Sequence, residues 1–308
     1  MSETALAPRP SPVAQPIPSP GGVRGWLRDP WRKPRILEAI TWGYLAWSII
    51  PVVIAIVYSF NAGRSRSSWQ GFSLRWWTID EDSLWRDEAL RQAMVQSIKL
   101  AGVTMLIAVP IGVAFAIGID RWRGRVASTA NFVMLFSFVV PEIIVGVALL
   151  LTFLFLLQNA VQLGTTAQLL GLVSRQISYA VIIVRARLLS IGKEYEEAGM
   201  DLGATPTDSV RRVLLPLLYP AIFASAAVVF ADAIDDFIVV RYLSGPATSE
   251  PLAVKIYAAA RSSPTPAVNA AATSMLIASL VAVAIGFVAY RHFAREQQRE
   301  GMSELTQF

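Results

Sequence analysis

Residues 93–119 read AMVQSIKLAGVTMLIAVPIGVAFAIGI, and this stretch decides the fold class of the chain. It carries a single charged residue, Lys99, and a helix of about 20 apolar residues is long enough to cross the hydrocarbon core of a bilayer. Of the 308 residues in the chain, 54% are hydrophobic and only 16% are charged, which is too apolar for a soluble domain of this size. The sequence therefore predicts an all-α membrane protein.

Similar apolar stretches recur along the chain and are separated by polar linkers. We expect six transmembrane helices, at residues 39–60, 93–119, 127–157, 167–190, 218–241 and 268–291. The fourth is the least apolar because it contains Arg175, Arg185 and Arg187, and a hydropathy window alone can miss it. Leaving it out would move the arginine-rich C-terminal segment to the outer side, against the preference of basic loops for the cytoplasm.

The two ends of the chain differ in composition from the membrane region, residues 39–293. Eight of the eighteen prolines lie before residue 36, so residues 1–38 are expected to form a disordered, Pro- and Arg-rich tail. The first apolar run starts only near residue 39 and is therefore expected to be an uncleaved span. We expect both this tail and the C-terminal tail, residues 294–308, to be cytoplasmic.

Residues 61–92 mix basic and acidic side chains and are expected to lie on the outer side of the membrane. Trp76, Trp77 and Trp85 are typical of a helix that lies in the membrane interface, and we expect one here.

The loop between the fourth and fifth expected spans, residues 193–217, has the pattern of two short helices joined by a sharp bend. Glu194, Glu196 and Glu197 favour the start of a helix because the helix dipole attracts carboxylates to that end. Gly203 then supplies a residue that can take the left-handed conformation at which helices stop.

The second helix of this loop has its own start signal. Thr205 fits the N-cap, Pro206 the first helical position and Asp208 the third. Pro216 and Pro220 are expected to mark the turn into the fifth span. The apolar face of this helix consists of Val210, Val213, Leu214 and Leu217.

The same loop resembles the signature of the permeases of bacterial ATP-binding-cassette (ABC) importers, which reads E-A-A, three residues, G, nine residues and I-x-L-P. Here Glu197-Ala198-Gly199, Gly203 and Val213-Leu214-Leu215-Pro216 follow that spacing, with Gly199 in place of alanine and Val213 in place of isoleucine. Glycine at position 199 should weaken the helix by roughly 1 kcal/mol. The resemblance implies the type I ABC importer permease fold, with this loop as the coupling helix that docks on the ATPase. The residues implied in ATPase coupling are Glu194, Glu197, Ala198, Gly199, Asp201, Gly203, Leu215 and Pro216. The alternative is a helical hairpin without a partner.

Further segments resemble the C-type permease of spermidine/putrescine importers. They are Val140-Pro141-Glu142-Ile143, Ile234-Asp235-Asp236-Phe237, Ser244-Gly245-Pro246 and residues 252–257 and 266–271. This resemblance implies a heterodimer with a second homologous permease, two cytoplasmic ABC ATPase subunits and an extracytoplasmic substrate-binding protein. It also implies a multi-pass protein of the bacterial inner membrane that imports polyamines by alternating access.

Four acidic residues inside the expected spans bear on the substrate. Asp232, Asp235 and Asp236 are spaced to share one face of a helical fifth span, which should line a wet pathway rather than lipid. Glu142 follows Pro141, where a break in the helix would turn its carboxylate toward that pathway. An acidic pathway favours cations such as polyamines and disfavours sulfate or phosphonate. In the alternative interpretation, the acids serve only packing and pair with Lys99, Arg241 or a basic group of a partner subunit.

The sequence predicts no chemistry within the chain itself. The phosphate-binding pattern G-x-x-x-x-G-K-[ST] does not occur, so we expect ATP and Mg²⁺ to be used by the partner ATPase and no cofactor to be bound here. The chain has no cysteine and one histidine, His292, which disfavours a metal site, and no enzyme motif is recognisable. The net charge of +5 comes from loops between spans, so nucleic acid is not an expected partner.

Two other functions fit the same features. One is an ABC permease for another cationic or metal substrate. The other is a carrier driven by an ion gradient through the acidic residues, which would work without an ATPase and would usually show an internal repeat that is not seen here.

Overall fold

The computed structural model describes residues 35–65, 68–121, 124–262 and 265–305, and it describes side chains up to residue 292. The expected disordered tail, except for its last four residues, lies outside this part of the chain. The chain divides into two compact units, Met1–Val52 and Val53–Phe308, which are treated separately. Within the described ranges the secondary structure is helical, apart from an isolated β-bridge between Asn61 and Phe72.

The first unit contains most of α2 (Arg35–Tyr58), which continues into the second unit. α2 is one of five described helices that are long and apolar enough to cross a membrane. A bent pair of helices supplies a sixth candidate span, so the fold class expected from the sequence is confirmed.

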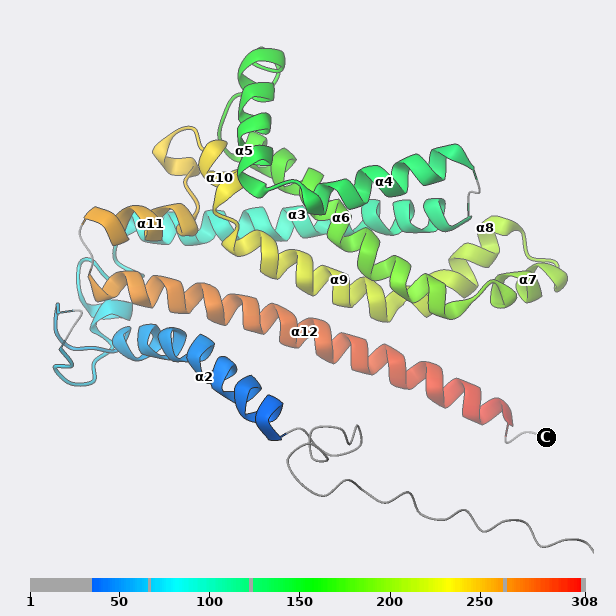
Figure 1. Ribbon diagram of the computed structural model, residues 1–308, viewed down its shortest axis with the longest axis horizontal. Helices are drawn as coiled ribbons and strands as arrows, with labels where there is room; N and C mark the ends of the chain where they lie inside the picture. The colour runs from blue at the N-terminus through cyan, green and yellow to red at the C-terminus, as the bar shows by residue number, and fades with distance from the viewer. Residues whose placement is uncertain (1–34, 66–67, 122–123, 263–264, 306–308) are drawn as a thin grey trace, which may run out of the picture. The chain divides into compact units, whose positions relative to one another are not determined.

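The second unit is built around four long helices that pack side by side (Figure 1). α3 (Glu88–Arg121) packs against α6 (Thr165–Ile191) and α9 (Leu215–Asp235), and α9 packs against α12 (Pro266–Leu305). Small residues allow the close approach of these helices. A Cβ atom on Gly112 of α3 would lie only 2.5 Å from the Cβ atom of Ala180 of α6.

The third expected span is not one straight helix. It consists of α4 (Arg125–Val139) and α5 (Glu142–Leu151), and α5 continues into the short π-helix η2 (Thr152–Leu156). The chain bends by 108° between α4 and α5. The break lies at Val140, which has the extended backbone favoured before a proline. The break expected beside Glu142 is confirmed, and the third expected span is a bent pair of helices.

The fifth expected span also has different limits. A continuous helical stretch runs from α8 (Pro206–Ser209) through the π-helical turn η3 (Val210–Leu214) into α9, so Pro216 and Pro220 mark no turn. In η3 the N–H of Leu215 donates to the carbonyl of Val210, five residues back. This wider turn lies next to Pro216, which lacks the N–H that a regular α-helix needs and crowds the preceding turn.

The expected stretch of helix beyond Asp235 is broken as well. α9 ends at Asp235, the backbone of Asp236 is not helical (φ −55°, ψ 119°), and the short helix α10 (Ile238–Tyr242) follows. Asp236 therefore does not share a helical face with Asp232 and Asp235, because it lies outside the helix. The chain continues through η4 (Ala247–Ser249) and α11 (Leu252–Ser262) to α12.

The segment between α2 and α3 contains no long interfacial helix in its described residues. Its helical part is the five-residue turn η1 (Arg75–Ile79). Trp76 is fully buried there and its Nε1–H donates to the carbonyl of Asn61 at 2.7 Å, so it is a core residue and not a membrane anchor. Trp85 is 52% exposed.

Candidate functional site

Two regions hold the residues singled out in the sequence, and both belong to the second unit. The first is the loop at residues 193–217, which we call the hairpin. Its first arm is α7 (Glu194–Asp201), and Glu194, Glu196 and Glu197 lie in the first turn of this helix as expected. Figure 1 shows the hairpin at the end of the bundle opposite to α10 and α11.

The bend of the hairpin follows the local signals of the sequence. Gly203 has a φ of +90°, which confirms the expected left-handed stop. Thr205 is the N-cap of α8: its Oγ1 accepts the N–H of Asp208 at 3.2 Å and donates to the Asp208 carboxylate at 2.6 Å. Pro206 occupies the first turn, where its missing N–H has no cost. These capping contacts join residues that lie within four positions of one another in the sequence.

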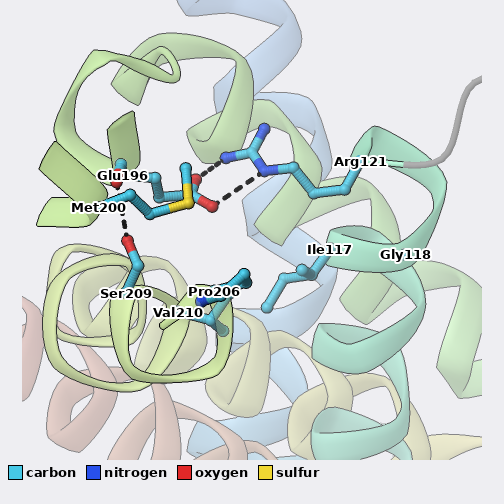
Figure 2. Close-up of a pocket in the computed structure, with 8 residues that line it drawn as sticks. All are labelled: Ile117, Gly118, Arg121, Glu196, Met200, Pro206, Ser209 and Val210. Atoms are coloured by element: carbon cyan, nitrogen blue, oxygen red, sulfur yellow. Dashed lines mark hydrogen bonds and ion pairs between the residues drawn. The ribbon is translucent and has the colours of Figure 1, made fainter. Parts of the chain in front are cut away.

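The inner side of the hairpin is tied to the end of α3 (Figure 2). Arg121, the last residue of α3, forms an ion pair with Glu196, and its Nε donates to Oε2 of that glutamate at 3.3 Å. The Ser209 hydroxyl donates to the carbonyl of Glu196 at 3.1 Å and joins the two arms. Between these contacts lies a cavity of about 380 Å³. It is lined by Ile117, Gly118, Arg121, Glu196, Met200, Pro206, Ser209 and Val210.

The residues implied in ATPase coupling fall into two groups by position. Glu194, Glu197, Ala198, Asp201 and Gly203 are exposed on the outer face of the hairpin, whereas Gly199, Leu215 and Pro216 are half-buried. Leu202 at the tip of the hairpin, which no sequence pattern singled out, is 91% exposed. A leucine between an aspartate and a glycine carries no signal in a single sequence, so its exposure became apparent only in the structure.

Gly199 has a packing role that the sequence did not reveal. A Cβ atom at this position would lie 3.3 Å from Oγ of Ser209 and 3.5 Å from Cγ2 of Val213. Glycine therefore lets the second arm pack close to α7, which offsets part of its low helix propensity.

The second region is a cluster of acidic residues around Arg175 of α6, which we call the Arg175 cluster. Nη2 of Arg175 lies 2.9 Å from Oε1 of Glu142 and 3.0 Å from Oδ2 of Asp232, and Nη1 lies 2.9 Å from Oδ2 of Asp236. Nε2 of Gln176 also donates to Asp232, at 2.6 Å. Three carboxylates from α5, α9 and the link after α9 thus meet one guanidinium group.

The four acidic side chains differ in their solvent exposure. The side chain of Asp236 is 2% exposed, and its Oδ1 also accepts the N–H of Val239 at 3.0 Å. The side chains of Asp232 and Glu142 are 31% and 51% exposed. Asp235 is exposed and takes no part in the ion pairs of Arg175. The cluster is therefore closed at Asp236 and open at Glu142.

The counter-ion in this cluster is a residue that sequence reasoning did not assign. Lys99 and Arg241 were the intramolecular partners considered for the acids, but Arg241 instead lies 4.0 Å from Glu250, and Arg175 occupies the cluster. The only signal for Arg175 was its presence inside an expected span, where an arginine is costly unless it is paired. Its partners are 33, 57 and 61 residues away in sequence, so no local pattern could identify them.

Comparison with known proteins connects both regions to transport. A family model described as binding-protein-dependent transport system inner membrane component matches residues 108–299, which include the hairpin and the Arg175 cluster. The chain is 32% identical over 238 residues to the spermidine/putrescine transport system permease protein PotC of Escherichia coli K12, covering 77% of this chain and 87% of that protein. It is also 32% identical over 280 residues to the putrescine transport system permease protein PotI of the same strain, covering 89% and 94%.

Solved structures support the same fold at lower sequence identity. A bacterial ABC transporter involved in the import of the acidic polysaccharide alginate contains a chain that matches with a TM-score of 0.66 at 17% identity, covering 87% of this chain and 96% of that one. A chain of an inward-facing methionine ABC transporter matches with a TM-score of 0.54 at 18% identity, covering 68% and 98%.

Proposed function

The chain belongs to the family of inner membrane components of binding-protein-dependent transport systems and is an ABC importer permease, and from this premise we propose that it imports polyamines. It is a multi-pass protein of the inner membrane. The sequence relatives PotC and PotI are named for spermidine and putrescine transport, and both match most of this chain.

The observation that carries the polyamine proposal is the excess of negative charge where two helices break. Glu142 begins α5 directly after the first break, and Asp232, Asp235 and Asp236 lie at the second. Arg175 supplies one positive charge to three of these acids, and Asp235 is exposed beside them. A molecule that carries several ammonium groups fits such a site, whereas an anion would be repelled.

The hairpin is the proposed contact with the ATPase. Its outer face exposes Glu194, Glu197 and Asp201, and Leu202 extends from its tip. Its inner face is fixed to α3 through Arg121. A force applied to the tip would therefore reach α3 directly and α9 through the continuous helix from Pro206.

The complete importer would contain a second permease, two ATPase subunits that use ATP and Mg²⁺, and a binding protein that delivers the polyamine. The hairpin and both ends of the chain would face the cytoplasm. ATP-driven closure of the ATPases would move the hairpins and open the pathway outward, and hydrolysis would return it to the inward-open state.

The substrate can be tested with the whole importer reconstituted in liposomes with its binding protein. Asp235→Asn is expected to lower spermidine and putrescine uptake at least tenfold because it removes an exposed acid that is not paired with Arg175, while the complex assembles normally. Glu81→Gln removes an exposed acid outside the cluster and serves as the control. Unchanged uptake by Asp235→Asn, or uptake of another cation in place of polyamines, would contradict the proposed substrate.

The orientation can be tested separately because the chain contains no cysteine. Thr207→Cys in the hairpin and Glu81→Cys between α2 and α3 place single thiols at exposed positions. A maleimide that cannot cross the membrane should label position 81 in spheroplasts and position 207 only after the membrane is opened. The reverse pattern would overturn the coupling role of the hairpin.

A further inference from the structure

Arg175 lies between two helix breaks, the one between α4 and α5 and the one between α9 and α10. Glu142 is the first residue after the break between α4 and α5, and Asp236 is the first residue after the end of α9. Both carboxylates lie 2.9 Å from nitrogens of the same guanidinium group. Arg175 of the unbroken helix α6 therefore joins the start of α5 to the link between α9 and α10.

The contacts of Arg175 differ in how easily they can be released. The side chain of Arg175 is only 11% exposed, and on the Asp236 side its partner is buried and also held by the N–H of Val239. On the other side, half of the Glu142 side chain is exposed. An incoming cation can reach Glu142 and Asp232 but not Asp236, so the ion pairs of Arg175 with Glu142 and Asp232 are the ones open to competition.

We propose that Arg175 is a positioning residue that acts as an internal counter-cation. Without substrate it holds α5 against the α9–α10 link, and ammonium groups of the substrate replace its guanidinium at Glu142 and Asp232. The release removes the ionic link between α6 and α5, so that α5 is held against α10 by side-chain packing alone, while Asp236 retains Arg175. The identity of the competing cation rests on the proposed function, whereas the holding role of Arg175 does not.

The chemistry of the side chain explains why an arginine is needed. A guanidinium group is planar and offers several N–H donors in a fixed fork, which lets it contact three carboxylates at once. A lysine carries its charge on one nitrogen at the end of a flexible chain and cannot span the same three groups. Arg175→Lys thus keeps the charge of the cluster but loses the link between the two breaks.

The test is a distance measurement between spin labels on α5 and α10 in the whole importer in nanodiscs. Ile144→Cys and Arg241→Cys provide exposed labelling positions on these two helices, which pack against each other. We expect one narrow distance distribution for the otherwise native chain. Arg175→Gln and Glu142→Gln should each broaden it in the absence of polyamine, and Arg175→Lys should have an intermediate effect.

A matched control and a second readout separate this role from general damage to the fold. Arg187→Gln removes the same charge from the same helix outside the cluster and should leave the distribution unchanged. In Glu142→Gln, Arg175 keeps its ion pairs with Asp232 and Asp236. This variant therefore tests the holding role of Arg175 even if Arg175→Gln fails to assemble. ATP hydrolysis without substrate should rise at least threefold in Glu142→Gln.

The outcomes also distinguish this inference from the proposed function. If Arg175→Gln and Glu142→Gln both keep the native distance distribution, the holding role of Arg175 is overturned even where polyamine uptake is demonstrated. If the variants broaden the distribution but the polyamine-loaded binding protein does not broaden that of the native chain, the holding role stands and polyamine is not the competing cation.

Discussion

The hairpin and the Arg175 cluster are built in opposite ways. The bend of the hairpin is made by contacts within a few residues, such as the bonds between Thr205 and Asp208. The Arg175 cluster joins residues that are 33 to 61 positions apart in sequence. The first region exposes most of its acidic side chains at the surface, whereas the second gathers three carboxylates around one half-buried guanidinium group. A single local change should therefore break the hairpin, while the cluster should respond in proportion to the burial of the residue that is changed.

The largest effect is expected at the bend of the hairpin. Gly203→Asp places a side chain on a residue with a φ of +90°, which costs about 1–3 kcal/mol and shifts the tip. We expect uptake to fall by more than a hundredfold and the ATPase to co-purify poorly. Gly71→Asp is the control, because Gly71 also has a positive φ, of +111°, and open space around it but lies between α2 and α3, outside the hairpin. Normal uptake by Gly203→Asp in a complete complex would refute the coupling role.

The cluster predicts a graded response that follows burial. Asp236→Asn removes the charged acceptor of two buried hydrogen bonds, from Arg175 and from the N–H of Val239, and should destabilise the protein by about 2 kcal/mol, seen as a lower Tm in detergent. Asp235→Asn should change the free energy of unfolding by less than about 0.5 kcal/mol because Asp235 is exposed. Equal losses of stability in the two variants would show that burial does not set the contribution of each acid.

The contact between the hairpin and α3 should show a smaller, reciprocal effect. Arg121→Glu and Glu196→Arg should each reduce uptake severalfold, because each places like charges together at the base of the hairpin. The double variant restores opposite charges and should recover most of the uptake, with a coupling energy of about 1 kcal/mol. If the loss of uptake in the double variant equals the combined losses of the two single variants, the ion pair does not transmit movement from the hairpin to α3.

The smallest effect is expected outside both regions, at Asp80 between α2 and α3. The N–H of Asp82, together with Arg75 and Arg64, lowers the pKa of Asp80 below its usual value, although burial acts in the opposite direction. A carboxylate with a lowered pKa in the folded state stabilises the fold at neutral pH and loses this contribution as the pH falls through that pKa. Asp80→Asn should therefore lower the Tm slightly at pH 7. The Tm of this variant should also fall less than that of the native protein when the pH is lowered. An identical pH dependence in both proteins would rule out this contribution.

The sequence was most informative where structure is local or set by the membrane. The apolar stretches predicted the helices that can cross a membrane, and Gly203, Thr205 and Pro206 predicted the bend of the hairpin, because backbone preferences and capping act within a few residues. The break beside Glu142 was also predicted, from Pro141. The limits of the fifth helix were not predicted. The π-helical turn η3 lets the helix continue past Pro216, and no sequence pattern indicates such a turn.

By itself the sequence determined the class of the protein, the positions of its apolar helices and the shape of the hairpin, because each depends on hydrophobicity or on neighbouring residues. Only the tertiary structure decided which charges meet. It placed Arg175 among Glu142, Asp232 and Asp236, joined Arg121 to Glu196 and buried Trp76. A charged side chain in an apolar environment needs a partner, but the partner is chosen by the packing of helices that are distant in sequence.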